Sequence, residues 1–159
     1  MVEAITRPTQ IEISQKALKN NVAVVKRVSG AEKIFLAVKS NAYGLGLIPT
    51  AKAAVAGGVY GLAVAIIDEA LALRHERITA PVLILGISPA EYAELMAVQH
   101  IMATVVSLDW LQEAAQYLTG EQRLHVSLGV DTGMGRIGFR DRQSLSEAID
   151  YVQAHRDKI

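Results

Sequence analysis

Short apolar runs alternate with helix-forming segments along almost the whole of this 159-residue chain, and this alternation limits the possible folds more than any other feature. The runs occupy residues 34–38, 61–65, 81–86, 102–106 and 124–130. Unbroken apolar runs, such as the one at 34–38, are typical of parallel strands covered on both faces. The sequence therefore predicts an α/β fold in which strand and helix alternate five times behind a leading helix at 15–28. Residues 11–13 alternate in polarity and predict one further short strand.

Capping residues mark several of the expected helix starts. Ser14 and Ser107 are predicted to cap the helices at 15–28 and 108–118. Ser88, followed by Pro89 and an acidic residue, predicts another helix start. Ser144 is predicted to open the last helix through a capping box, and further helices are expected at 47–56 and 68–74.

Two architectures accommodate these repeats. A (β/α)₈ barrel of the TIM type needs about 250 residues, or about 31 per unit, so this chain would supply about five units. An open, five-stranded doubly wound sheet would be complete at this length. Length alone favours the doubly wound sheet, and the residues so far leave both architectures open.

Composition excludes several classes of function. Sixteen basic residues balance sixteen acidic ones, so no electrostatic feature indicates a nucleic acid or an anionic membrane as partner. The chain has no cysteine, and its four histidines are scattered without ligand spacing, so no metal site is predicted. The N-terminus lacks the apolar core of a signal peptide, and no apolar stretch approaches the roughly 20 residues that span a bilayer. These features predict a cytoplasmic protein.

A lysine ends the first apolar run. Lys39 follows Val38 directly, and Ser40, Asn41 and two nearby glycines predict a sharp turn behind it. Parallel α/β folds place their chemistry at the carboxyl ends of strands. Partial desolvation there would favour the neutral amine, which Schiff-base chemistry with an aldehyde requires. From position alone, a lysine that simply reaches into solvent is the commoner outcome.

A glycine-rich segment follows the fifth apolar run. Its glycines at 133, 135 and 138 satisfy the spacing G-x-G-x-x-G of dinucleotide-binding loops, but the next predicted helix cap lies six residues further on. We therefore interpret the glycines as allowing the backbone to approach a ligand while Arg136 projects into the site. Asp131 is expected to cap the turn that follows it. The only tryptophan, Trp110, is expected to pack in the interior.

Two segments resemble one enzyme family. The residues A-V-K-S-N-A-Y-G-L-G at 37–46 closely resemble the pyridoxal-phosphate attachment segment of bacterial alanine racemases, A-V-x-K-A-N-A-Y-G-H-G or close to it. Ser40 and Leu45 stand where that family usually has Ala and His. The run D-T-G-M-G-R-I-G at 131–138 is similar to the family's D-T-G-M-G-R-x-G. Weaker matches at 64–74 and 81–86 follow the same order, so the resemblance covers nearly the whole chain but less than half of a complete family member.

The resemblance implies a fold and a cofactor. The chain, residues 1–159, would be the N-terminal part of a pyridoxal-phosphate-binding (β/α)₈ barrel, with the rest of the barrel and a C-terminal β domain lying outside it. Lys39 would hold pyridoxal 5′-phosphate covalently as an aldimine and would serve as the catalytic base. Tyr43 would contact the cofactor phosphate, and Arg136 would contact the ring phenolate and lie near the substrate carboxylate. The family often has a lysine where this chain has Gly129, so Arg136 would be held in another way.

The implied activity is the interconversion of L-alanine and D-alanine, which supplies D-alanine for cell-wall peptidoglycan. The family works as a homodimer with shared active sites, in which the second acid/base is a tyrosine from the other subunit's C-terminal domain. No residue here matches that tyrosine, so this chain alone is expected to be inactive. The alternatives are a serine or broad-specificity racemase, a non-catalytic barrel that binds pyridoxal phosphate, and an α/β domain without chemistry.

Overall fold

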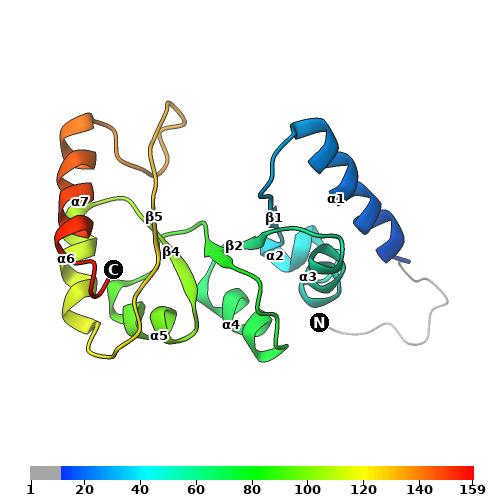
Figure 1. The fold of residues 1–159 in the computed structure, drawn as a ribbon, viewed down its shortest axis with the longest axis horizontal. Helices are drawn as coiled ribbons and strands as arrows, with labels where there is room; N and C mark the ends of the chain where they lie inside the picture. The colour runs from blue at the N-terminus through cyan, green and yellow to red at the C-terminus, as the bar shows by residue number, and fades with distance from the viewer. Residues whose placement is uncertain (1–11) are drawn as a thin grey trace.

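The computed structural model describes residues 12–159, in which strands and helices alternate (Figure 1). The strands are β1 (Phe35–Ala37), β2 (Gly61–Val64), β3 (Val82–Ile84), β4 (Ile101–Val105) and β5 (Val126–Leu128). The helical segments are α1 (Gln15–Ser29), α2 (Lys39–Tyr43), α3 (Leu47–Ala56), α4 (Ile67–His75), the 3₁₀ turn η1 (Ala90–Tyr92), α5 (Ala93–Val98), α6 (Leu108–Tyr117) and α7 (Arg142–Ala154). All five predicted strands after residue 30 are confirmed, with ends that differ by a few residues.

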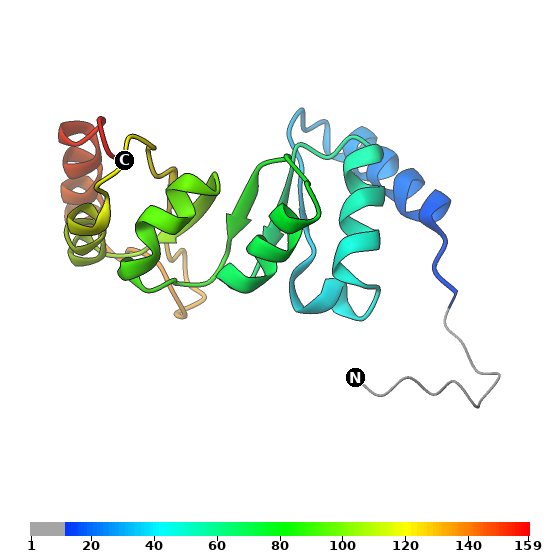
Figure 2. The same ribbon diagram turned by 90° about the horizontal axis from the view of Figure 1, so that it is seen from below.

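The five strands form one parallel sheet whose spatial order is the order of the chain, β1-β2-β3-β4-β5. A doubly wound sheet reverses its strand order at a switch point, so that alternative is wrong. Successive neighbours are instead the arrangement of consecutive units in a (β/α)₈ barrel, which confirms the predicted fold class. Figures 1 and 2 show the units following one another from α1 at one end of the molecule to α7 at the other.

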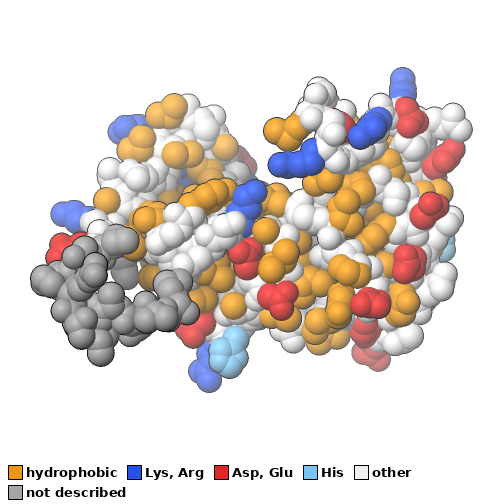
Figure 3. Space-filling model, turned by 180° about the vertical axis from the view of Figure 1, so that it is seen from behind, with side chains coloured by type: hydrophobic (Ala, Val, Ile, Leu, Met, Phe, Trp, Pro, Cys, Tyr) orange, Lys and Arg blue, Asp and Glu red, His pale blue; other side chains and the backbone are white. Residues whose placement is uncertain are grey.

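The core lies between the sheet and the helices that cover it. The central strands β2 and β3 contribute Leu62, Val64, Val82 and Ile84, all fully buried. The helices add Leu73 from α4, Met96 from α5 and Leu111 from α6. Burying a side chain of this size stabilises the fold by about 1.5–3 kcal/mol. Apolar side chains also reach the surface over much of one face of the molecule (Figure 3).

Two of the predicted helix caps are confirmed. The Ser14 hydroxyl accepts a hydrogen bond from the backbone N–H of Ala17 at 3.1 Å, and the Ser107 hydroxyl accepts one from Trp110 at 3.2 Å. The prediction for Ser144 is wrong, because α7 begins two residues earlier. Asp141 caps it instead, with its carboxylate accepting from the Ser144 N–H at 2.8 Å. A charged carboxylate is a stronger acceptor than a hydroxyl, which explains the earlier start.

The predicted cap at Ser88 is also wrong. Pro89 has an extended backbone, so the chain forms η1 before α5, and the Ser88 side chain makes no capping bond. The Ser88 carbonyl instead accepts a hydrogen bond from the indole Nε1 of Trp110 at 2.6 Å. Trp110 is buried, as predicted, and it ties this loop to α6.

Two further expectations concern the N-terminus and membranes. Of the strand predicted at 11–13, Glu12 and Ile13 have no regular structure, and Ile11 lies outside the described residues. Within residues 12–159, no helix combines the length and the apolarity needed to cross a membrane.

Candidate functional site

A pocket of about 540 Å³ lies at the carboxyl ends of the strands. This volume is within the range of about 300–1,000 Å³ that small-molecule sites occupy. Each strand contributes to the wall with its last residues or with the loop behind it, and the lining residues are Lys39, Ala65, Leu83, Leu85, Gly86, Ile87, Thr104, Ser127, Gly129, Val130, Arg136 and Ile137. The fold thus brings Lys39 and Arg136 into one pocket, at the sheet edge where the sequence predicted the chemistry.

The pocket is cationic. Its polar side chains are two cations, Lys39 and Arg136, and two hydroxyls, Thr104 and Ser127, and no Asp or Glu lines it. The Thr104 hydroxyl donates to the Ile84 carbonyl at 2.6 Å and is therefore engaged with the sheet. Neither cation's side chain has a hydrogen bond or an ion pair within residues 12–159. Two positive charges that form no ion pair, in a pocket without a carboxylate in its lining, suit an anionic ligand.

The half-buried Lys39 is positioned by an unusual turn directly behind it. In the segment 40–43, four successive residues other than glycine have left-handed backbone angles, with φ between 52° and 55°. A left-handed conformation costs an L-amino acid roughly 1–2 kcal/mol per residue, so contacts elsewhere must maintain this turn. The N–H of Ala42 donates to the Val38 carbonyl at 2.8 Å, which closes α2 as a single left-handed turn.

Asn41 fixes the exit from this turn. Its side-chain oxygen accepts from the N–H of Leu47 at 2.8 Å, at the start of α3. Its backbone carbonyl accepts from the N–H groups of Gly44 at 3.1 Å and Gly46 at 2.9 Å. Both glycines have positive φ, and a Cβ at Gly46 would lie 2.9 Å from Pro49. The sharp turn predicted behind Lys39 is therefore confirmed.

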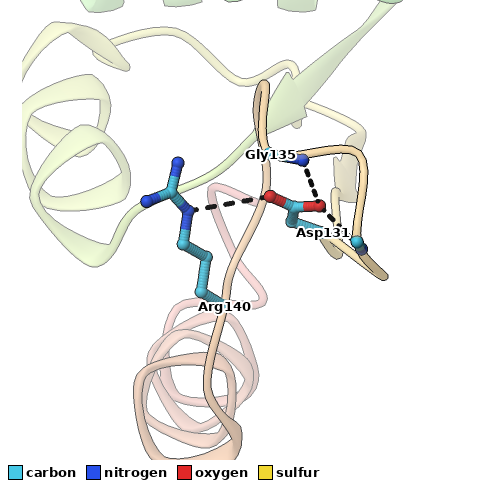
Figure 4. Close-up of polar contacts among 4 residues, drawn as sticks. Asp131, Gly135 and Arg140 are labelled. Carbon is cyan, nitrogen blue, oxygen red and sulfur yellow. Dashed lines mark hydrogen bonds and ion pairs between the residues drawn. The ribbon is translucent and has the colours of Figure 1, made fainter.

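Asp131 shapes the loop that carries Arg136 (Figure 4). Its carboxylate accepts hydrogen bonds from the N–H groups of Gly133 and Gly135, each at 3.0 Å, and lies 3.6 Å from the Arg140 guanidinium. These bonds, with the largest effect from Gly135, hold the pKa of Asp131 below its ordinary value, and the charge of Arg140 lowers it further. The prediction that Asp131 caps this turn is confirmed.

Backbone bonds close the same loop at its base. The Asp131 N–H donates to the Phe139 carbonyl at 2.9 Å, and the Phe139 N–H donates to the Gly129 carbonyl at 2.8 Å. Gly138 has a φ of 124°, and a Cβ there would lie 2.5 Å from the Asp131 nitrogen. These glycines close a loop, and α7 begins only at Arg142, so the segment lacks the loop-to-helix geometry of a dinucleotide fingerprint.

Two positions singled out in the sequence lie differently. The Tyr43 side chain is 66% exposed and does not line the pocket, so its contact with a cofactor phosphate stays a prediction. Gly129 does line the pocket, and a Cβ there would lie 3.5 Å from the side chains of Thr104 and Val106, an ordinary contact distance. A small side chain at position 129 would therefore pack against Thr104 and Val106 at the wall of the pocket.

Sequence analysis missed three residues around the pocket. Thr104 and Ser127 lie within predicted strands, and their place near the carboxyl ends is the feature that could have identified them. Glu69 lies in the first turn of α4, where a carboxylate is expected simply to favour the helix dipole. Its carboxylate in fact bonds the backbone next to Lys39, a contact that no sequence pattern reveals.

The comparison with known families decides the identity. Residues 13–159 match the family model described as alanine racemase, N-terminal domain. The chain belongs to the alanine racemase family. It shares 48% identity with a lysine racemase of Oenococcus oeni and 46% with an alanine racemase of Ligilactobacillus salivarius, aligned over 99% and 100% of this chain.

Solved structures of the family agree in fold. The crystal structure of alanine racemase from Oenococcus oeni superposes with a TM-score of 0.91 and 46% identity over 96% of this chain. The chain spans less than half of each of these relatives: 42% of the lysine racemase, 43% of the alanine racemase and 44% of the solved chain.

Proposed function

We propose that this chain is the lysine-bearing part of an amino-acid racemase that uses pyridoxal phosphate and interconverts L-alanine and D-alanine. The observation that carries the proposal is the meeting of Lys39 and Arg136 in one cationic pocket at the strand ends. Family membership supports it, as does the name of the Ligilactobacillus salivarius relative, an alanine racemase.

The residues present fit the chemistry of pyridoxal phosphate. The cofactor carries an aldehyde, a phenolate and a phosphate. The pocket offers an amine at Lys39 and a guanidinium at Arg136, and its lining has no carboxylate that would repel the phenolate or the phosphate. When bound, the cofactor supplies an electron sink for the pair left behind when an α-proton is removed. We propose that Lys39 is its covalent attachment point, that Arg136 orients the ring phenolate or the substrate carboxylate, and that Tyr43 reaches the phosphate.

Lys39 carries the one amine among the side chains that line this pocket, and an amine can take up a proton and give it back. Arg136 keeps its charge, and the hydroxyls of Thr104 and Ser127 are poor acids. A base on one side of the substrate removes and returns the α-proton on that side only. Inversion therefore requires a second acid from outside this pocket wall. We propose that a homodimer of the complete protein supplies it and that this chain alone does not racemise alanine.

A second candidate concerns the substrate. The relative from Oenococcus oeni is named a lysine racemase, so relatives of this chain differ in their amino-acid substrate. We therefore keep serine or a broader set of amino acids as the alternative substrate class. With alanine as substrate, the product D-alanine would serve peptidoglycan synthesis from the cytoplasm. A barrel that binds pyridoxal phosphate without catalysis is the non-enzymatic alternative.

Borohydride trapping tests the proposal. Pyridoxal phosphate added to the chain should give a visible absorbance band, and reduction should fix the label on Lys39, as located by peptide mass spectrometry. Lys39→Ala should abolish the band. Lys16→Ala, which removes an exposed lysine of α1, should leave it intact. A label spread over surface lysines and unchanged in Lys39→Ala would contradict the proposal.

A further inference from the structure

Glu69 connects the ends of two strands next to the pocket. It lies in the first turn of α4, and one carboxylate oxygen accepts a hydrogen bond from the Ser40 N–H at 2.6 Å. The other oxygen accepts from the Ala65 N–H at 2.7 Å. Ser40 directly follows Lys39, and Ala65 lines the pocket behind β2. One carboxylate thus links the backbone behind β1 to the backbone behind β2.

The two bonds have different meanings. The bond to Ala65 spans four residues and resembles an ordinary capping contact at a helix start. The bond to Ser40 spans 29 residues and does not cap α4, the helix that carries Glu69. It fixes the peptide group that joins Lys39 to Ser40, and therefore the backbone angle that aims the Lys39 side chain. It also supports the first residue of the left-handed turn, Ser40, which has a φ of 54°.

We infer that Glu69 is a positioning residue for Lys39: its carboxylate holds the left-handed turn so that the lysine amine stays directed into the pocket. The inference rests on the proposed function in one respect, because the benefit of a fixed amine is its reaction with the cofactor aldehyde. Charge-assisted hydrogen bonds to backbone N–H groups are short and strong, as expected for a contact with this task.

The chain contains a matched control. Glu94 on α5 also uses its carboxylate to bond two backbone N–H groups of a distant loop, those of Thr119 at 3.1 Å and Gly120 at 3.3 Å. Neither Glu94 nor this loop lines the pocket. Glu94→Ala therefore removes the same kind of contact without touching the surroundings of Lys39.

The test combines two measurements on the full chain. Amide hydrogen exchange should accelerate about tenfold over residues 40–44 in Glu69→Ala, the equilibrium change for one lost hydrogen bond to a charged group. The rate of borohydride-trapped labelling of Lys39 by pyridoxal phosphate should fall by a similar factor. Glu94→Ala should accelerate exchange near residues 119 and 120 and leave Lys39 labelling unchanged. Glu69→Gln, which keeps the size but only one acceptor oxygen, should shift both measurements in the same direction by less.

The outcomes separate the inference from the function on which it rests. Unchanged exchange at 40–44 in Glu69→Ala would overturn the inference. If labelling nevertheless slowed, the charge of Glu69 would act directly on the reaction of Lys39 and not through the turn. Equal labelling in the Glu69 and Glu94 variants would overturn it too. Failure of the unaltered chain to react at Lys39 would contradict the proposed function, while the exchange comparison would still show whether Glu69 holds the turn.

Discussion

Lys39 and Arg136 are cations without a paired carboxylate, yet a carboxylate shapes the loop that carries each of them. Glu69 bonds the residue after Lys39, and Asp131 bonds two glycines just before Arg136. In both cases the carboxylate accepts from backbone N–H groups and leaves the cation free to meet a ligand. The loop geometry of the site therefore depends on carboxylates that bond the backbone and not the two cations.

Asp131 makes the stability of the chain depend on pH. Its folded-state pKa is lowered, so its contribution is fully present above the unfolded pKa of about 3.9 and is lost as the pH falls through the lower folded value. We expect the melting temperature of Asp131→Asn to be lower than that of the unaltered chain. The difference should be constant at pH values higher than about 5 and should shrink at pH values lower than about 4. Thermal melts between about pH 7 and pH 2 measure this, within the range over which folding is reversible.

The control for this prediction is Asp150→Asn. Asp150 lies exposed on α7 and makes none of the loop bonds, so the interval between its melting point and that of the unaltered chain should not follow the same profile. An Asp131→Asn interval that stays constant down to the lowest pH would show that the charge of Asp131 does not support the loop.

Among the elements, α4 makes contacts at both ends of the strands. Its first turn carries Glu69 at the pocket, and its last turn carries Arg74 at the opposite end of the strands. Arg74 donates to four backbone carbonyls, those of Ile78 at 2.6 Å, Ala80 at 2.9 Å, Gln99 at 2.8 Å and His100 at 2.8 Å. It thereby holds together the loops that lead into β3 and β4.

Replacing Arg74 should destabilise the whole fold. Partial burial of the guanidinium lowers the pKa of Arg74, but an arginine remains charged, and its bonds to carbonyls are charge-assisted. We expect Arg74→Met to lower the free energy of unfolding by about 2–3 kcal/mol, because several carbonyls lose their donor at once. Arg27→Met, at an exposed position of α1, should change it by about 0.5 kcal/mol or less. Denaturant titration measures both, and equal midpoints would refute the structural role of Arg74.

For the molecule as a whole, the described residues wall the pocket on one side only. Among residues 12–159, β1 pairs only with β2 and β5 only with β4. Large apolar side chains stay exposed around this end of the sheet: Tyr43, Ile66, Ile87, Val130 and Met134. These side chains are therefore exposed to water, and high-dielectric surroundings weaken electrostatic interactions.

This arrangement and the proposed function together predict how the chain behaves with L-alanine. Incubated with L-alanine and pyridoxal phosphate in deuterated water, the chain should incorporate α-deuterium slowly and form almost no D-alanine. Loss of one general acid typically costs about 10²–10⁴-fold in rate. Mass spectrometry and chiral chromatography separate the two products, with Lys39→Ala as the negative control and a complete alanine racemase as the positive one. Robust D-alanine formation by this chain would show that a second acid lies within it.

The sequence by itself determined the α/β class of the fold and singled out Lys39 and Arg136, which the structure brings into one pocket. Apolar runs that alternate with segments of helical periodicity predict a parallel sheet covered by helices. The position of Lys39 at a strand end and the glycine spacing around Arg136 are local features that a linear chain displays. The sequence predicted helix starts less well. Asp141 and Ser144 both suit the cap position of α7, and Asp141, the stronger acceptor, occupies it.

Only the tertiary structure showed the features that depend on residues far apart in the chain, namely the order of strand pairing and the contacts around Lys39. Length favoured a doubly wound sheet and the family resemblance favoured the barrel, and the pairing of each strand with its successor confirmed the barrel order. The contact of Glu69 with Ser40 joins residues 29 apart, and the left-handed turn it supports opposes the local preference of four L-residues. The sequence predicted a sharp turn here but not its left-handed backbone, which local hydrogen bonds and this one distant contact together maintain.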